Sequence, residues 1–390
     1  MSWPMVRLGS VARLINGRAY KKNELLPEGK YRVLRVGNFF SNRGWYWSDL
    51  NLPEDKYCDD GDLLYAWSAS FGPQIWDGGK VIYHYHIWKL ELDEEKVDKK
   101  YLFHALEYDV EKIKLEQGTG STMIHVTKSA MEERQIPLPP LDEQKRIAAI
   151  LDKADAIRQK RKQAITLADE FLRSVFLEMF GDPVTNPKGW SRKEIKEGVS
   201  RITSGWSAKG DSRPCGQGEV GVLKISAVTS GEFKPKENKF VEKHIIPEGK
   251  NLIFPKKGDL LFSRANTREL VAATCIVPKD CDDVFLPDKL WNIELSSEEL
   301  MPEYFHMLLQ DDKFKETLTS QATGSSGSML NISKQKFETT LAPFAPIDLQ
   351  MKFKNIYWHL KDNAANMKNS EDYLIEQFNA LSQKAFSGQL

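Results

Sequence analysis

Two short patterns in the sequence could in principle support nucleotide binding or catalysis. Residues 216–221 satisfy the G-x-G-x-x-G spacing of a dinucleotide-binding loop, which requires a strand before it and a helix after it. The opposite order is expected here, because loop residues precede the glycines and the strand-like segment 222–225 follows them. Pro287-Asp288, followed by residues 311–313, imitates the carboxylates and lysine of a metal-dependent nuclease, but patterns this short arise easily by chance.

Histidines and cysteines offer no stronger case for a metal site. His84 and His86 share one face of an expected strand, without a cysteine or carboxylate ligand nearby, so strand packing is the favoured interpretation. The cysteines show no C-x-x-C spacing, which argues against a zinc site or a disulfide framework and fits a reducing compartment; they are Cys58, Cys215, Cys275 and Cys281. A methyltransferase would be expected to show an N/D-P-P-Y/F element, and the sequence has none. We therefore expect a non-catalytic chain with no metal and no cofactor of its own.

Charged and amide side chains among aromatic residues are better candidates, and their chemistry would be contact with DNA. Arg and Asn can make bidentate hydrogen bonds to a base edge, whereas Lys mostly contacts phosphate. In the first half of the chain the candidates are Arg18, Lys21, Lys22, Arg35, Asn38, Asn42 and Arg43. In the second half they are Lys209, Arg213, Lys224, Lys234, Lys236, Arg264, Asn266 and Arg268. Each residue alone is better explained by solvent exposure, but together they flank duplicated elements, which favours DNA contact for the group.

The elements that must position these residues occur twice. Gly-Asp-Leu-Leu-Tyr at residues 61–65 returns as Gly-Asp-Leu-Leu-Phe at residues 258–262. Further pairs are residues 13–17 with 201–205, residues 33–36 with 222–225, and residues 123–128 with 329–334. A repeat of this kind predicts one structural unit used twice.

Each half runs from mixed strand and helix signals through a proline-rich segment into a long helix. This order predicts an α+β fold with target-facing globular domains at residues 1–137 and 186–343, joined by helical segments at residues 138–185 and 344–390. The first helix should begin near Asp142 and end at a Gly-Asp-Pro sequence. About 40 residues at about 1.5 Å each would make it roughly 60 Å long.

A helix of that length cannot be buried by one small domain, so the two long helices are expected to pair as an antiparallel coiled coil. The alternative is that each helix packs on its own globular half. Apolar residues at steps of three and four define the expected seam; they are Ile147, Ile150, Ala154, Ile157, Phe171, Phe353, Ile356, Leu360, Met367 and Leu374. A basic run at residues 158–162 could touch DNA phosphates, although a solvated helix face is the simpler interpretation.

Length and composition limit the remaining possibilities. A chain of 390 residues predicts two or three domains, and an aromatic content of 11% makes disorder an unlikely main state. Lys plus Arg number 55 and Asp plus Glu also number 55, so any DNA-binding surface must come from the placement of charge and not from its total. No apolar run approaches the length of a membrane span and no leader pattern is seen, so a cytoplasmic protein is expected.

Two segments resemble a known family. Residues 136–147, which run through three prolines to Asp142, Gln144 and Ile147, and residues 176–183 resemble signature regions of the specificity subunits of type I restriction-modification systems. The whole chain is similar to that family's plan of recognition domain, spacer helix, recognition domain and spacer helix. The second proline segment departs from the pattern at residues 344–345, but Gln350 stays in register.

The resemblance implies more than the spacing shows. Specificity subunits of this kind are not enzymes: they bind a bipartite, asymmetric DNA sequence, each recognition domain reads one half, and the coiled coil sets the gap. They recruit two modification subunits, which bind S-adenosylmethionine and methylate adenine, and two ATP-dependent, magnesium-requiring restriction subunits. Base flipping and catalysis would belong to the partners. Two rivals stay open from the sequence alone: a self-contained methyltransferase or nuclease, and a coiled-coil scaffold without sequence preference.

Overall fold

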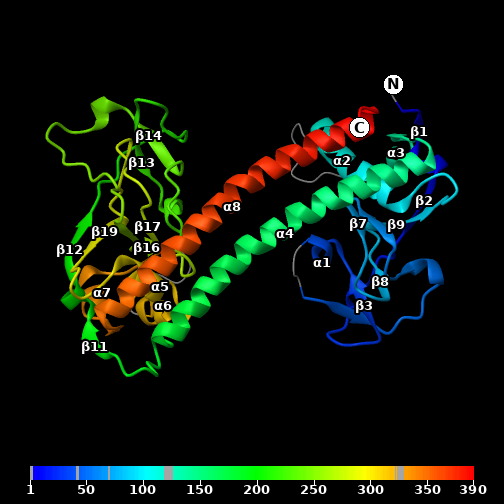
Figure 1. Ribbon diagram of the computed structural model, residues 1–390. Helices are drawn as coiled ribbons and strands as arrows, with labels where there is room; N and C mark the ends of the chain where they lie inside the picture. Colours follow the sequence, from blue (N-terminus) through cyan, green and yellow to red (C-terminus); the bar gives the residue numbers. More distant parts are fainter. Residues whose placement is uncertain (1–2, 41–43, 69–70, 118–125, 321, 323–328) are drawn as a thin grey trace. The chain divides into compact units, whose positions relative to one another are not determined.

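Short strands and two long helices make up the chain in a computed structural model, which describes residues 3–40, 44–68, 71–117, 126–320, 322 and 329–390 (Figure 1). The chain divides into two units. Unit 1 comprises residues 1–163 and 369–390, and unit 2 comprises residues 164–368. The long helices α4 (Leu141–Phe180) and α8 (Ile347–Ser387) therefore each contribute one part to each unit.

Within its described residues, unit 1 contains two four-stranded sheets and one strand pair. Its strands are β1 (Met5–Arg7), β2 (Ala12–Asn16), β3 (Tyr31–Leu34), β4 (Tyr46–Ser48), β5 (Tyr57–Cys58), β6 (Leu63–Ala66), β7 (Gly72–Ile75), β8 (Val81–Tyr83), β9 (Ile87–Leu92) and β10 (Gln135–Pro137). The sheet orders are β2-β9-β6-β7, β4-β3-β8-β5 and β1-β10. Helices and 3-10 turns connect them: α1 (Val36–Phe40), α2 (Lys99–Gln117), α3 (Lys128–Glu132), η1 (Leu8–Ser10), η2 (Lys22–Glu24) and η3 (Glu54–Lys56).

Unit 2 repeats this plan. Its strands are β11 (Ser191–Glu194), β12 (Val199–Ser204), β13 (Val220–Leu223), β14 (Asn238–Val241), β15 (Leu260–Ser263), β16 (Ala265–Asn266), β17 (Thr274–Ile276), β18 (Val284–Phe285), β19 (Leu290–Leu295), β20 (Leu330–Asn331) and β21 (Leu341–Phe344). The sheet orders are β12-β19-β15-β17, β14-β13-β18, β11-β21 and β16-β20. The connecting elements are α5 (Pro302–Gln310), α6 (Asp312–Thr319), α7 (Lys334–Glu338), η4 (Ile195–Gly198), η5 (Ile225–Ala227) and η6 (Lys243–Ile245).

The strand pairing shows that the internal repeat is structural. Of the two largest sheets in each unit, we call the one with fewer residues the smaller sheet, β4-β3-β8-β5 or β14-β13-β18, and the four-stranded sheet β2-β9-β6-β7 or β12-β19-β15-β17 the larger sheet. An inner strand of the smaller sheet, β3 or β13, pairs antiparallel with the strand after it and parallel with a later one, β8 or β18. The duplicated Gly-Asp-Leu-Leu sequence forms the start of β6 and β15, which hold equivalent places in the larger sheets. The predicted α+β class and two-unit plan are confirmed. The glycine pattern at residues 216–221 runs from a turn into strand β13 and does not lie between a strand and a helix.

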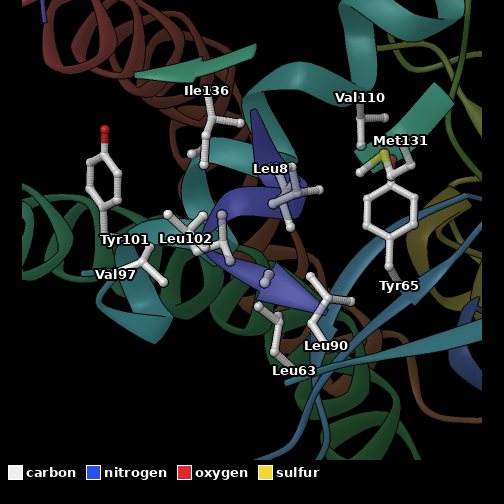
Figure 2. Close-up of a cluster of buried hydrophobic side chains, with 14 of the residues drawn as sticks. Leu8, Leu63, Tyr65, Leu90, Val97, Tyr101, Leu102, Val110, Met131 and Ile136 are labelled. Carbon is white, nitrogen blue, oxygen red and sulfur yellow. The ribbon is translucent and has the colours of Figure 1, made fainter. Parts of the chain in front are cut away.

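Each unit encloses the ends of both long helices in its own hydrophobic core. In unit 1 the cluster around Leu8, Tyr101 and Met131 (Figure 2) also contains Ile147 of α4 and Phe386 of α8. In unit 2 the equivalent cluster joins Leu172, Phe176 and Phe180 of α4 with Phe353 and Tyr357 of α8. The start of α4 thus meets the end of α8 in one unit and the reverse holds in the other, which makes the pair antiparallel, as predicted.

Parts of the predicted seam are wrong. Ile157 is 48% exposed and Phe171 is 56% exposed, whereas Leu172 is 2% exposed. At about 100° per residue, Leu172 lies within about 20° of the direction of Ile147, and Phe171 lies about 120° away. The apolar stripe predicted from the sequence therefore begins on the buried face of α4 at Ile147 and has left that face by Phe171.

The other predicted seam residues stay on or near the buried face. Ile147 and Phe353 are fully buried, and the rest are half-buried: Ile150, Ala154, Ile356, Leu360, Met367 and Leu374.

A buried glutamine fastens the start of each long helix. The Gln144 side-chain amide donates to the carbonyl oxygens of Lys96 (2.9 Å) and Pro139 (2.9 Å), and its oxygen accepts from the Asp98 backbone N–H (2.8 Å). Gln350 makes the same three bonds in unit 2, to Glu299, Ala345 and Met301. Both side chains are fully buried. The glutamine in register in the family signature is therefore a clamp between the proline segment, the following helix and the domain.

Replacing this clamp should destabilise one unit at a time. Gln144→Ala leaves two carbonyls and one N–H unpaired in a buried place, and each unpaired group costs about 1–3 kcal/mol, so we expect unit 1 to lose about 3 kcal/mol or more. Hydrogen exchange of unit 1 amides would show the loss, and Gln350→Ala should produce it in unit 2. Gln159, exposed on the same helix, supplies the matched control. Equal effects of Gln144→Ala and Gln159→Ala would contradict the clamp.

Each long helix also ends at a tryptophan from a strand-forming segment. Trp3 Nε1 donates to the Ala385 carbonyl (2.7 Å) at the end of α8, and Trp190 Nε1 donates to the Phe180 carbonyl (2.8 Å) at the end of α4. The segment that begins with Trp3 therefore does for α8 what the segment that begins with Trp190 does for α4. In unit 1 this contact brings the first described residues beside the last helix (Figure 1).

Candidate nucleic-acid interface

The smaller sheet of each unit carries one predicted DNA-contact residue at the same place. We call these sheets, β4-β3-β8-β5 and β14-β13-β18, the reader sheets. Arg35 directly follows the central strand β3, and Lys224 directly follows β13. Because the two central strands have the same neighbours in the same directions, Arg35 and Lys224 occupy equivalent positions. The repeat thus places a cation at the end of the same strand in both units.

Arg35 is held in position by its surroundings. Its Nη2 donates to the Gly44 carbonyl (2.9 Å), and its guanidinium lies 4.2 Å from the centre of the Tyr46 ring, a cation-π contact. The Arg35 backbone N–H donates to Asn38 Oδ1 (3.2 Å), so Asn38 also shapes the turn that carries the arginine. Lys224 lies 3.9 Å from Glu237 and is less constrained. A guanidinium held this way is suited to a base edge, and an ammonium to a phosphate.

Arg18 and Arg213, two further candidates, are each bound by a carboxylate of their own unit. Arg18 makes two hydrogen bonds to Glu24 (2.8 and 3.0 Å), and Arg213 makes two to Glu219 (2.6 and 2.8 Å). Hydrogen bonds from these arginines and from backbone N–H groups lower the pKa of Glu24 and of Glu219 to about 2, so both carboxylates stay charged at neutral pH. In the unbound protein both arginines therefore fix the shape of their loops, a role the sequence did not reveal.

The remaining lysine candidates lie on the solvent-exposed surface around the reader sheets. Lys21 and Lys22 belong to the loop after β2, and Lys209 lies in the equivalent loop after β12. Lys234 and Lys236 precede β14. Their exposure agrees with phosphate contact but does not distinguish it from simple solvation. Asn42 and Arg43 lie outside the described residues.

Arg264, Asn266 and Arg268 lie at a different edge of unit 2. Arg264 precedes β16, Asn266 belongs to it, and β16 pairs with β20 and not with the reader sheet. Asn266 Oδ1 accepts from the Thr267 backbone N–H (2.8 Å), whereas Arg268 is exposed. The structure therefore separates the second-half candidates into two groups, one on the reader sheet and one beside the larger sheet.

A glycine at the same place in both units allows the chain after β8 or β18 to pass very close to the end of β2 or β12. Gly17 and Gly205 directly follow β2 and β12. A Cβ at Gly17 would overlap the carbonyl oxygens of Tyr83 and His84, and one at Gly205 would overlap the carbonyl of Leu286. Only glycine lets the turn between β8 and β9, or between β18 and β19, cross the end of the strand at this distance. This explains why the residue pair 17 and 205 stands out in the sequence repeat.

The structure corrects the expectation for His84 and His86. Both lie in the segment that joins β8 to β9 and not within a strand, because the chain leaves the reader sheet there to enter the larger one. Burial, with the nearby His86 and Arg35, lowers the pKa of His84 to about 4, so its imidazole is neutral at pH 7. Among the described residues, no group of three or more His, Cys, Asp or Glu side chains could hold a metal ion.

Sequence reasoning missed two residues of this region, Trp67 and Arg32. Trp67 directly follows β6 and packs against His86 (4.9 Å between ring centres) and Tyr85 (6.0 Å). Arg32 lies 4.9 Å from the Trp45 ring centre on the first reader sheet. A signal for Trp67 was present, since it comes two residues after the duplicated Gly-Asp-Leu-Leu-Tyr element, on its variable flank.

Part of the basic run at residues 158–162 of α4 takes part in helix packing. Arg158 donates two hydrogen bonds to Asp155 (2.6 and 3.1 Å) and lies 4.5 Å from the ring centre of Phe378 on α8. It therefore helps join the two long helices in unit 1. Within the part of the chain that the structure describes, no helix is long and apolar enough to cross a membrane.

Comparisons with known proteins agree with this geometry. Residues 2–167 match the family model of the type I restriction modification DNA specificity domain. The type I restriction enzyme MjaVIII specificity subunit of Methanocaldococcus jannaschii is 27% identical over 83% of this chain and 78% of that protein. The EcoBI specificity subunit of Escherichia coli is 21% identical over 100% of this chain and 86% of that protein. A solved type I system S subunit from M. genitalium has a TM-score of 0.59 at 18% identity, covering 99% and 96% of the two chains.

The fold of two similar units and two long helices is similar to that of the specificity subunits of type I restriction-modification systems, and residues 2–167 match the model of the DNA specificity domain of those systems. The resemblance predicted from residues 136–147 and 176–183 is confirmed.

Proposed function

We propose that this chain is the DNA sequence-recognition subunit of a type I restriction-modification complex, with one half of a bipartite target read by each unit. The main support for the proposal is that Arg35 and Lys224 occupy equivalent positions on the two reader sheets. Competition binding with the assembled complex tests it: one bipartite duplex should outcompete scrambled duplexes at about 0.2 M salt. Equal binding to all duplexes would leave only phosphate contact and contradict the proposal.

The chemistry would belong to partner subunits. Two modification subunits would bind S-adenosylmethionine and methylate adenine, and two restriction subunits would use ATP and magnesium. This chain would need no cofactor and would act in the cytoplasm. The support is the set of relatives named as specificity subunits, together with the absence of recognisable methyltransferase and phosphate-loop motifs from the sequence.

The long helices would set the gap between the half-sites. Helix α4 has 40 residues and α8 has 41, so each is about 60 Å long. One turn of B-DNA is about 34–36 Å, and two recognition units can meet one face of a duplex only when their spacing agrees with that repeat. We assign this spacing role to the antiparallel pair.

Exposed apolar residues on α4 offer a docking surface for the modification subunits. Leu167 is 60% exposed and Phe171 is 56% exposed, four residues apart on one helix face. Two such side chains buried by a partner contribute about 3 kcal/mol or more, so Leu167→Asp combined with Phe171→Asp should weaken assembly by over about 100-fold. Co-purification with separately produced modification subunits measures this. Glu170→Lys, on the same helix and also exposed, is the control; full assembly of the double variant would rule out this surface.

A further inference from the structure

One position in each unit has the same backbone bonds but a different side chain. Trp67 directly follows β6, and Arg264 directly follows β15. The Trp67 N–H donates to the His86 carbonyl (3.0 Å), as the Arg264 N–H donates to the Lys289 carbonyl (3.1 Å). The carbonyl of each residue in turn accepts from the segment before α3 or α7, at Val126 (3.4 Å) or Ile332 (2.8 Å). Trp67 and Arg264 are therefore structural equivalents.

Their side chains also perform the same local task. Trp67 Nε1 donates to the Tyr85 carbonyl (2.8 Å), and Arg264 Nε donates to the Asp288 carbonyl (2.9 Å). These two carbonyls belong to the equivalent turns that cross Gly17 and Gly205. Each side chain is thus fixed by one N–H against a turn at the edge of the interface, while the rest of the side chain differs in chemistry.

In unit 2 the position is polar and pre-organised. Arg264 Nη1 donates to Asn331 Oδ1 (2.8 Å), and Nη2 lies 3.6 Å from Asp288 Oδ2, an ion pair too long to be a hydrogen bond. Ser207 in turn donates to Asp288. The Arg264 side chain stays 25% exposed. A guanidinium held at Nε and at one side of Nη1 can offer its remaining N–H groups together to two acceptors.

In unit 1 the same position is aromatic. Trp67 lies against His86 and Tyr85, and Tyr85 is 37% exposed at the surface. The neighbouring His84 imidazole is neutral at pH 7 because burial and nearby cationic groups disfavour its charged form. The cluster therefore offers apolar ring edges where unit 2 offers hydrogen-bond donors.

A duplicated lysine accompanies both positions. Lys128 and Lys334 begin α3 and α7, two residues after Val126 and Ile332. Their side chains are 45% and 54% exposed, and each forms a long ion pair, of 3.6 or 3.7 Å, with a glutamate four residues on. An exposed ammonium is a suitable phosphate contact, so each variable side chain is flanked by a constant cation.

On the premise that the chain recognises DNA, we infer that Trp67 and Arg264 are matched specificity-determining residues, one for each half-site. Arg264 donates to the O6 and N7 acceptors of a guanine, the base edge that a fixed guanidinium fits best. Trp67 and Tyr85 make apolar contact with a thymine methyl group. The second half-site therefore contains a G·C pair read by Arg264, and the first contains an A·T pair read by Trp67.

The test is methylation by the reconstituted complex of a duplex library with every base at every half-site position. Arg264→Lys keeps the positive charge but loses the paired N–H donors of the guanidinium, so the preference for one G·C pair should fall about 10- to 100-fold. The preference in the other half-site and the salt dependence of binding should stay unchanged. Trp67→Leu should relax one A·T preference in the other half-site. Arg201→Lys, an exposed arginine of unit 2 paired with Glu294, is the control.

The outcomes separate the inference from the proposed function. A wild-type complex with no preferred bipartite target would overturn the proposed function itself. A normal wild-type target with every preference unchanged within about twofold in both variants would overturn only the inference, as would loss of both half-site preferences from one variant. If Arg264→Lys fails to fold, Asn331→Ala retains the arginine without its support and should weaken the same G·C preference; no change in it would also overturn the inference.

Discussion

Deleting seven residues from each long helix is expected to change the gap in the DNA target without changing either half-site. Seven residues remove about 10.5 Å of helix, which corresponds to about three base pairs of rise. They also correspond to nearly two full turns, so the apolar faces remain aligned within about 20°. Suitable segments are residues 159–165 of α4 and 365–371 of α8, which leave Leu167 and Phe171 in place and are in register because Asp169 lies opposite Lys361 in the antiparallel pair. Sequencing of methylated target libraries measures the gap.

A deletion in one helix alone is the matched control, because it changes the register of the two helices as well as their length. Removal of residues 159–165 alone shortens one helix and not its partner, so it should destroy the pairing and the activity. A double deletion that keeps activity with an unaltered gap would contradict the spacing role.

Placing a single methyl group on Gly17 or Gly205 is expected to disable one unit. The added Cβ meets backbone carbonyls, which cannot move without breaking the hydrogen bond from the Arg18 N–H to the Tyr83 carbonyl (3.0 Å) or from the Trp206 N–H to the Leu286 carbonyl (2.9 Å). Overpacking of this kind costs about 1–3 kcal/mol or more, so specific DNA binding should fall about 10- to 100-fold in Gly17→Ala and in Gly205→Ala.

Gly44 provides the control for these two variants. A Cβ at Gly44 would have no heavy atom of the described residues within 4 Å, and alanine keeps the carbonyl that accepts from Arg35, so Gly44→Ala should bind the specific duplex within about twofold of the wild type. Titration of a labelled target duplex with the assembled complex measures all three. Wild-type affinity in Gly205→Ala would mean that the turn after β18 does not help to form the recognition surface.

The repeat made much of the architecture predictable. The pairing of residues 61–65 with 258–262 and of 33–36 with 222–225 identified strands that indeed hold equivalent places in their sheets. The boundaries of α4 followed from the start signal near Asp142 and the Gly-Asp-Pro sequence after Phe180. These features depend on local sequence signals, and a signal that occurs at the same place in both halves can be distinguished from a chance match.

Features that depend on contacts between distant residues were not predictable. Arg18 and Arg213 read as exposed cations, because the sequence does not show that Glu24 and Glu219 fold back onto them. The buried stripe of α4 was displaced at Phe171, because a small error in helical period accumulates over 24 residues and the partner helix decides which face is covered. The register of the repeat places Trp67 on Arg264, but the hydrogen bond that each side chain makes to a turn carbonyl was not predictable, because it joins segments 18 or 24 residues apart and the two side chains differ in type.

The most direct test of the account is a genome-wide map of methylated adenines in cells that carry the partner subunits, with and without this chain. The account predicts that one bipartite, asymmetric motif is methylated only when the chain is present, and that Arg35→Ala and Lys224→Ala alter opposite halves of that motif. Methylation of the same motif in cells that lack the chain would contradict the claim that this protein selects the DNA sequence.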